Sequence, residues 1–234
     1  MWDLVFFPPG KRAIDNKWVF SKKEGAKKAN EARFLHTAWL VARGDLQSKG
    51  VDYGETFTPV VKLVSLRILL THATRTNLET RHWDITGIAF LNGDIDQEVY
   101  MKQPNGFDDG SGRVCRLRKA IYGLCQSARA FFQKLDSVLK ARSWIHTEWA
   151  MWKLYDNLVG SHVDDMCIVA SDSIRDSLCS DLKSERLPIN DLGDLTTYVS
   201  IQIVRDRPHC QIQLHQQEYA SKCSNLLEWK IVTH

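Results

Sequence analysis

Several stretches of the chain carry the hydrophobic pattern of an α-helix. Residues 63–76 are rich in leucine and isoleucine and lack turn-forming residues, which predicts a buried helix. From Ile121 to Leu139, apolar residues recur at spacings of three and four, which is typical of a long amphipathic helix with a core-facing stripe. We also expect helices over residues 173–187, with Ser173 as N-cap, and over residues 217–228.

Strand patterns lie between these helices. Short runs rich in β-branched and aromatic residues predict strands at residues 17–21, 80–93, 98–102, 197–204 and 211–214, the second of them running into a turn. Residues 103–112 are rich in turn formers. Because helices and hairpins are interspersed, the pattern favours an α+β fold with an antiparallel sheet.

One hairpin carries adjacent charges. From Asn157 to Ser171, two runs rich in β-formers flank Asp164 and Asp165, which places the acids at the tip of a predicted hairpin. Neighbouring side chains on a strand point to opposite faces, so at most one of the two faces the working surface unless the turn re-aims the other. An ordinary Asp-containing turn is the simplest interpretation of the pair alone.

Composition narrows the class of protein only partly. At 234 residues, with 44% hydrophobic and 25% charged content, the chain is long enough for one large domain or two subdomains. The net charge of +3 does not by itself indicate a nucleic-acid-binding protein. Basic residues are concentrated between Gly10 and Phe34, where they could contact phosphates or simply form a solvated surface.

Cysteine usage and hydropathy bear on compartment. The six cysteines form no C-x-x-C pair, so we expect neither a zinc site nor a disulfide framework, and the thiols should be reduced and intracellular. No apolar run approaches the 18 or so residues of a membrane span. We therefore expect no membrane partner.

A third acid changes the interpretation of the hairpin. Asp84 lies in the predicted strand of residues 80–93. If that strand lies beside the hairpin, Asp84, Asp164 and Asp165 converge on one sheet surface, where they repel each other unless protons or divalent cations neutralise them. Two Mg²⁺ or Mn²⁺ ions at such a site would suit phosphoryl transfer. Spacing alone does not exclude three unrelated surface aspartates, and an unrelated two-metal phosphohydrolase would use the same acids.

Several longer strings along the chain bear on the role of these acids. They are residues 16–20, 50–61, 89–107, 121–129, 163–166, 191–195 and 213–219. Together these strings resemble the reverse transcriptase domain of copia-type (Pseudoviridae-like) retrotransposons. The resemblance covers nearly the whole chain, and an ordered series of long strings is far more specific than any single motif.

The resemblance implies a right-hand polymerase fold and an RNA-directed DNA polymerase. Residues 1–62 and 94–120 would form the fingers, and residues 63–93 and 121–234 the palm, with an antiparallel sheet flanked by helices. Its partners would be a primed RNA or DNA template, deoxynucleoside triphosphates and other retrotransposon proteins. It would work inside the cell, in a cytoplasmic virus-like particle or in the nucleus.

The resemblance also assigns roles to individual residues. Asp84, Asp164 and Asp165 would bind two Mg²⁺ (or Mn²⁺) ions for nucleotidyl transfer to a primer 3′-hydroxyl. Phe90 would be the steric gate that excludes a ribose 2′-hydroxyl. The residues expected to place the incoming nucleotide and the template are Tyr122, Gly123, Gln126 and Arg129, with Lys22 and Lys23 as contacts to phosphate.

Departures from the family pattern fall near the expected chemistry. Trp39 stands where the family usually has an arginine, and a tryptophan cannot grip phosphate with two parallel hydrogen bonds. Phe90 lies six positions after Asp84 instead of five, and one extra strand residue reverses the facing of the residues after it unless a bulge, possible at Gly87, absorbs it. The other departures are Cys125 for lysine, Ala128 for proline, His162 for tyrosine and Ser200 for glycine.

These departures leave a second hypothesis open. A catalytically inactive retrotransposon remnant would retain the fold and weak nucleic-acid binding. The ribonuclease H, integrase and protease domains of family polyproteins have no counterpart in the sequence, so we expect a fragment of a decayed element.

Overall fold

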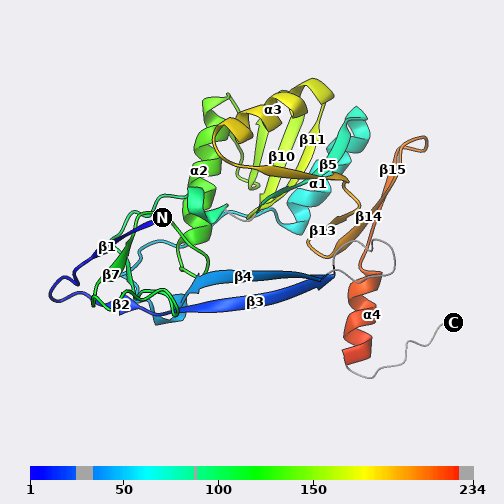
Figure 1. The fold of residues 1–234 in the computed structure, drawn as a ribbon. Helices are drawn as coiled ribbons and strands as arrows, with labels where there is room; N and C mark the ends of the chain where they lie inside the picture. The colour runs from blue at the N-terminus through cyan, green and yellow to red at the C-terminus, as the bar shows by residue number, and fades with distance from the viewer. Residues whose placement is uncertain (25–33, 87–88, 227–234) are drawn as a thin grey trace. The chain divides into compact units, whose positions relative to one another are not determined.

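The computed structural model describes residues 1–24, 34–86 and 89–226, which divide into two compact units (Figure 1). The first, here called the N-terminal unit, contains residues 1–58 and 90–135. The second, here called the sheet unit, contains residues 59–89 and 136–234. Each unit has a hydrophobic core cluster of its own. No helix in the described ranges is long and apolar enough to cross a lipid bilayer.

The sheet unit is built on a six-stranded sheet with the strand order β12-β5-β11-β10-β9-β8. Every neighbouring pair in it is antiparallel, which confirms the expected antiparallel α+β architecture. The predicted hairpin of residues 157–171 forms its centre. The strands are β5 (Glu79–Ile85), β8 (Ile145–His146), β9 (Met151–Leu154), β10 (Asn157–His162), β11 (Asp165–Ala170) and β12 (Ile189–Asp194).

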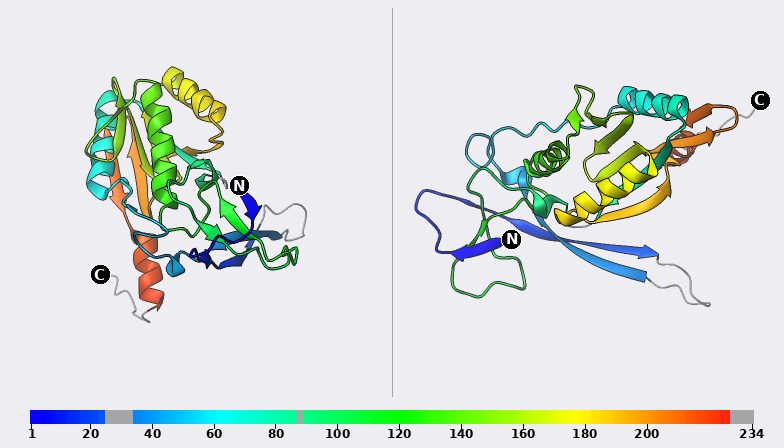
Figure 2. Two further views of the ribbon diagram at one scale, coloured as in Figure 1. Left: turned by 90° about the vertical axis from the view of Figure 1, so that its left-hand side faces the viewer. Right: turned by 90° about the horizontal axis from the view of Figure 1, so that it is seen from above.

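Two helices cover opposite faces of this sheet, as the view from above shows (Figure 2). Helix α1 (Leu63–Thr76) has the predicted bounds and ends where Asn77 adopts the left-handed conformation. Helix α3 (Asp172–Ser184) is shorter than predicted, and its N-cap is Ser171, so the prediction of Ser173 as N-cap was wrong. The reason is that β11 ends at Ala170, and the extended Ser171 already starts the helix.

A small three-stranded sheet shares a hydrophobic core cluster with α1. It contains β13 (Thr197–Tyr198), β14 (Ile201–Asp206) and β15 (Gln211–His215). The single strand predicted over residues 197–204 is broken because Val199 and Ser200 both have positive φ and form a tight turn. Helix α4 (Gln217–Leu226) comes next, and residues 227–228 of the predicted helix lie outside the described residues.

The N-terminal unit combines a four-stranded sheet, in the order β1-β7-β6-β2, with the long hairpin of β3 and β4. The hairpin extends beyond the predicted strand of residues 17–21, and the predicted strand of residues 98–102 is reduced to β6. The strands are β1 (Trp2–Val5), β2 (Ala13–Ile14), β3 (Asn16–Glu24), β4 (Phe34–Ala42), β6 (Tyr100–Met101) and β7 (Val114–Leu117).

Helix α2 (Ser127–Ala141) begins later than the sequence pattern predicted. Gly123 has a φ of +92°, so the segment before Ser127 cannot continue the helix backwards. Ile121 and Leu124 are nevertheless buried in the core of the N-terminal unit. Their spacing therefore reflected burial in a turn, which periodicity alone does not distinguish from a helix.

Candidate active site

The predicted acids lie on adjacent strands of the sheet unit. Strands β5 and β11 lie side by side (Figure 1). In their antiparallel pairing Asp84 lies opposite Asp165, and Asp164 occupies the turn just before β11. Directly opposed residues share a face of the sheet, with Cβ atoms about 4.5–5.5 Å apart. The expectation that the strand of Asp84 lies beside the hairpin is thereby confirmed.

The turn that carries Asp164 is strained and tied down. Val163 has a φ of +61°, which is unfavourable for a β-branched residue by about 1–3 kcal/mol. The Ser161 hydroxyl donates a hydrogen bond to the Val163 carbonyl at 2.6 Å. The Ile85 amide donates to the Asp164 carbonyl at 2.9 Å, so the hairpin tip is fastened to the end of β5.

The pKa of Asp164 shows the influence of burial and of the two neighbouring acids. Partial burial raises the pKa of Asp164 above the usual aspartate range, and the charges of Asp84 and Asp165 raise it further. The three carboxylates therefore act on one another, which is what a cation-binding or proton-sharing site requires.

Two residues that sequence analysis missed contact Asp165. The Nε2 atom of His82 is paired with the Asp165 carboxylate. The hydroxyl of Tyr198 donates a hydrogen bond to the Asp165 carbonyl at 2.9 Å. His82 could have been found, because it lies two residues before Asp84 and so points to the same face of the strand. Tyr198 could not, because no local pattern places it beside the hairpin.

Carboxylate oxygens are the donors that Mg²⁺ and Mn²⁺ prefer. Asp84, Asp164 and Asp165 offer donors of this type: Asp84 and Asp165 lie in register on adjacent strands, and both act on the charge of Asp164. Across the described ranges, no three His, Cys, Asp or Glu side chains are gathered into a metal cluster, and Asp165 is turned toward His82. The number of ions therefore stays a prediction.

In the N-terminal unit, aromatic rings surround the predicted steric gate. The ring centroids of Phe90 and Tyr122 are 4.4 Å apart, and Phe90 also contacts Phe131. Trp39, where the resemblance led us to expect an arginine, packs edge-on against Tyr122, with ring centroids 5.2 Å apart. Trp39 therefore belongs to this aromatic cluster, where a guanidinium would have brought positive charge.

The residue after Tyr122 is constrained by close backbone contact. A Cβ added to Gly123 would lie 2.1 Å from the Ala42 carbonyl oxygen, and the Ala42 amide donates to the Tyr122 carbonyl at 2.8 Å. Only glycine fits here. This close contact explains why the loop needs glycine at position 123. The predicted role of Gly123 in placing the nucleotide stays a prediction.

Two further predicted binding residues make hydrogen bonds within their own unit. Gln126 is only 4% exposed, and its amide donates to the Asp52 carbonyl at 3.0 Å and accepts from Gln47 at 3.2 Å. Arg129 donates to the Phe57 carbonyl at 3.2 Å. These bonds hold the loop of residues 47–57, and the predicted contacts to nucleotide and template stay predictions.

The remaining predicted residues lie on β3 and after β5. Lys22 is exposed on β3, and only the backbone of Lys23 is described. Phe90 lies in a 3₁₀ turn (Phe90–Asn92), and β5 already ends at Ile85. The extra residue before Phe90 therefore falls in a connection, so the expected reversal of strand facing does not arise. Gly87 lies outside the described residues.

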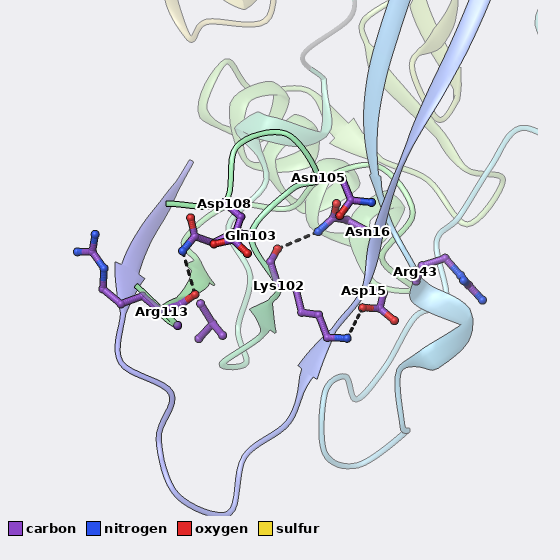
Figure 3. A pocket seen from close by; sticks show the side chains of 10 residues that line it. Asp15, Asn16, Arg43, Lys102, Gln103, Asn105, Asp108 and Arg113 are labelled. Carbon is purple, nitrogen blue, oxygen red and sulfur yellow. Dashed lines mark hydrogen bonds and ion pairs between the residues drawn. The ribbon is translucent and has the colours of Figure 1, made fainter. Parts of the chain in front are cut away.

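A polar pocket that sequence analysis did not predict lies in the N-terminal unit (Figure 3). Lys102 pairs with Asp15 at 2.7 Å across it, and the Asn16 amide donates to the Lys102 carbonyl at 2.8 Å. Arg43 and Arg113 at its rim are paired with acids as well. Because its cations are matched by acids, the pocket has no marked preference for anions.

The comparison with known protein families identifies the class of protein to which this fold and these acids belong. The model of the family described as reverse transcriptase (RNA-dependent DNA polymerase) matches residues 1–229. The chain therefore belongs to the reverse transcriptase family.

Relatives specify the branch of that family. The chain is 36% identical over 234 aligned residues, 94% of its length, to the retrovirus-related Pol polyprotein from transposon TNT 1-94 of Nicotiana tabacum. It is 36% identical over 216 residues, 87% of its length, to the retrovirus-related Pol polyprotein from transposon RE2 of Arabidopsis thaliana. A Ty1 Gag-Pol polyprotein of Saccharomyces cerevisiae is 28% identical over 69% of the chain. The resemblance to copia-type Pol polyproteins is thus confirmed.

The chain corresponds to a small part of these relatives. It spans 17% of the length of the tobacco polyprotein, 14% of the Arabidopsis polyprotein and 9% of the yeast polyprotein. The comparison therefore concerns the reverse transcriptase segment and not the whole polyproteins.

Proposed function

We propose that the protein is an RNA-directed DNA polymerase domain that transfers deoxynucleotides to the 3′-hydroxyl of a primer on an RNA or DNA template. The observation that carries the proposal is the β5–β11 register, which sets Asp84 opposite Asp165, while the turn with Asp164 is fastened to the end of β5 by the Ile85 amide. Membership of the reverse transcriptase family supports it.

The proposed metal ligands are Asp84, Asp164 and Asp165. Together they would bind two ions, either Mg²⁺ or Mn²⁺. A divalent cation bound there would lower the pKa of the primer hydroxyl and balance charge on the departing pyrophosphate. Asp164 follows Val163 in the strained turn at the end of the hairpin, and Asp84 lies on the neighbouring strand β5. Repulsion among the three acids makes this face selective for a positively charged group.

We assign residues 63–93 and 121–234 to a palm, and residues 1–62 and 94–120 to fingers. The two compact units divide the chain at similar places, except that residues 121–135 group with the N-terminal unit. Within the residues assigned to the palm, Phe90 and Tyr122 would contact the sugar of the incoming nucleotide. Lys22 and Lys23 would contact phosphates. Other retrotransposon proteins are the proposed partners of the domain.

Primer extension on an RNA template with Mg²⁺ or Mn²⁺ tests the proposal. Asp164→Asn should lower the extension rate by about a hundredfold or more, because it removes a charge on which the transition state depends. Asp156→Asn, at an exposed turn of the same unit, is the matched control and should extend normally. If the wild-type protein extends no primer and Asp164→Asn behaves identically, the polymerase assignment is wrong.

A non-catalytic nucleic-acid-binding remnant is the second candidate, and Trp39 is the observation that favours it. Its ring packs on Tyr122 at the position where the family usually has arginine. Trp39→Arg should lower the KM for deoxynucleotide by about tenfold if the missing charge limits the enzyme. Trp149→Arg, an exposed tryptophan of the sheet unit, controls for added charge.

Binding separates the two candidates when no extension is seen. A remnant should bind a primer-template with an affinity that falls steeply as salt rises, because phosphate contacts release counterions. Equilibrium binding at two salt concentrations measures this. A protein that neither extends a primer nor binds one in a salt-dependent way would fit neither candidate.

A further inference from the structure

We propose that His82 and Tyr198 are positioning residues that together fix Asp165, one through its carboxylate and the other through its backbone. The inference rests on the proposed function, because it concerns how one acid of that site is held. Neither residue belongs to the strings on which the family resemblance was based.

His82 controls the direction of the Asp165 side chain. Both residues point to the same face of the sheet, since His82 lies two residues before Asp84 on β5 and Asp84 is opposite Asp165. The Nε2 atom of His82 contacts a carboxylate oxygen of Asp165. The two side chains are only 18% and 31% exposed, so competition from water for this contact is limited. The pair therefore restricts the rotamers of Asp165.

Tyr198 holds the backbone of the same residue. It is 1% exposed, and its hydroxyl donates to the Asp165 carbonyl at 2.9 Å. A buried hydroxyl without an acceptor would be costly, so this bond is strongly favoured.

The two residues that contact Asp165 also contact each other. The rings of His82 and Tyr198 meet edge to face, with centroids 5.9 Å apart at 74°. Tyr198 thus limits the positions that the imidazole can take while it also holds the strand on which Asp165 lies. Because Val163 strains the adjacent turn, the hairpin tip needs such restraints to keep its conformation.

Three variants separate the contributions. His82→Leu removes the hydrogen-bond donor, and His82→Gln restores an N–H group of similar reach. Tyr198→Phe removes only the hydroxyl and keeps the ring against His82. His209→Leu is the matched control, because His209 pairs with Asp206 at 2.8 Å on an exposed turn of the same unit.

The first measurement is Mn²⁺ binding to the full chain, monitored by the paramagnetic resonance of free Mn²⁺ at one fixed pH and without nucleic acid. His82→Leu should bind Mn²⁺ about 10- to 100-fold more weakly, as found for residues that orient metal ligands. His82→Gln should recover most of that loss. Tyr198→Phe should weaken binding by about fivefold, the effect of one hydrogen bond, and His209→Leu should bind like the wild type.

The second measurement is single-turnover primer extension. The positioning variants should lower the maximal rate and leave the KM for deoxynucleotide unchanged, whereas a general loss of structure would change both values and the thermal unfolding temperature. If His82→Leu fails to fold, Tyr198→Phe and His82→Gln decide the question.

Asp165→Asn distinguishes failure of the inference from failure of the proposed function. If Asp165→Asn binds Mn²⁺ and extends primers like the wild type, the proposed role of Asp165 is wrong and the inference falls with it. If Asp165→Asn is defective but His82→Leu and Tyr198→Phe behave like the wild type, only the positioning inference is overturned.

Discussion

At the scale of single residues, the two adjacent acids of the hairpin have different surroundings. Asp164 lies in the strained turn, where burial and the neighbouring acids raise its pKa. Asp165 begins β11 and contacts His82 and Tyr198. The sequence DD could predict that two acids lie at a hairpin tip, but not that one is held by an imidazole and a phenol from other strands.

Ser200 is a residue whose side chain conflicts with its backbone. It has a φ of +62° in the turn between β13 and β14, a conformation that costs a non-glycine residue about 1 kcal/mol or more. Ser200→Gly should therefore raise the free energy of unfolding by about 1 kcal/mol, measured by urea denaturation.

The same chemical change in a helix should have the opposite sign. Ser173→Gly, in the first turn of α3, should lower the free energy of unfolding by about 0.5 kcal/mol, because glycine is the poorer helix former. If Ser200→Gly were also destabilising, the positive φ of residue 200 would not be a source of strain.

At the scale of elements, local patterns predicted helices better than strands. Helix α1 has the predicted bounds because its apolar run is followed by Asn77, which adopts the left-handed conformation and ends the helix. Strand β12 (Ile189–Asp194) was missed because its sequence, INDLGD, has little strand character. It is a strand because it pairs with β5, a contact between distant segments that no local pattern contains.

The edge strand β8 should make stability depend on pH through His146. Burial lowers the pKa of His146 below its ordinary value, and its ring packs against Trp152 at 5.1 Å. The folded state therefore binds fewer protons than the unfolded state just below the ordinary pKa of about 6.5. It follows that the free energy of unfolding falls as the pH is lowered through this window.

His146→Phe keeps a ring against Trp152 and removes the titration. The stability of the variant relative to the wild type should rise as the pH is lowered from about 7.5 to about 5, by less than about 1 kcal/mol because the site is partly exposed. Denaturation at several pH values measures this. Tyr155→Phe, an exposed aromatic change in the same unit, should show no such trend.

At the scale of the whole molecule, the chain forms two compact units, each of which contains a hydrophobic core cluster. Leu69 is fully buried in the sheet unit, and Met101 is fully buried in the N-terminal unit. Truncating either residue to alanine should cost about 2–5 kcal/mol through lost burial and the cavity left behind.

The two truncations should act in different places. Amide hydrogen exchange measured by mass spectrometry should show faster exchange within residues 59–89 and 136–226 for Leu69→Ala, and within residues 1–58 and 90–135 for Met101→Ala. Uniform acceleration across the whole chain in both variants would mean that the units unfold as one.

The sequence by itself determined the family, the α+β class, the hairpin with Asp164 and Asp165, and the candidate role of Asp84. Those features follow from the local hydrophobic pattern and from the long strings that match the family. Both can be identified from consecutive residues of the sequence. The tertiary structure decided that Asp84 lies opposite Asp165, that Trp39 packs on Tyr122, and that His82 and Tyr198 hold Asp165. These contacts join residues far apart in sequence, and their existence depends on strand pairing and burial, which local periodicity does not specify.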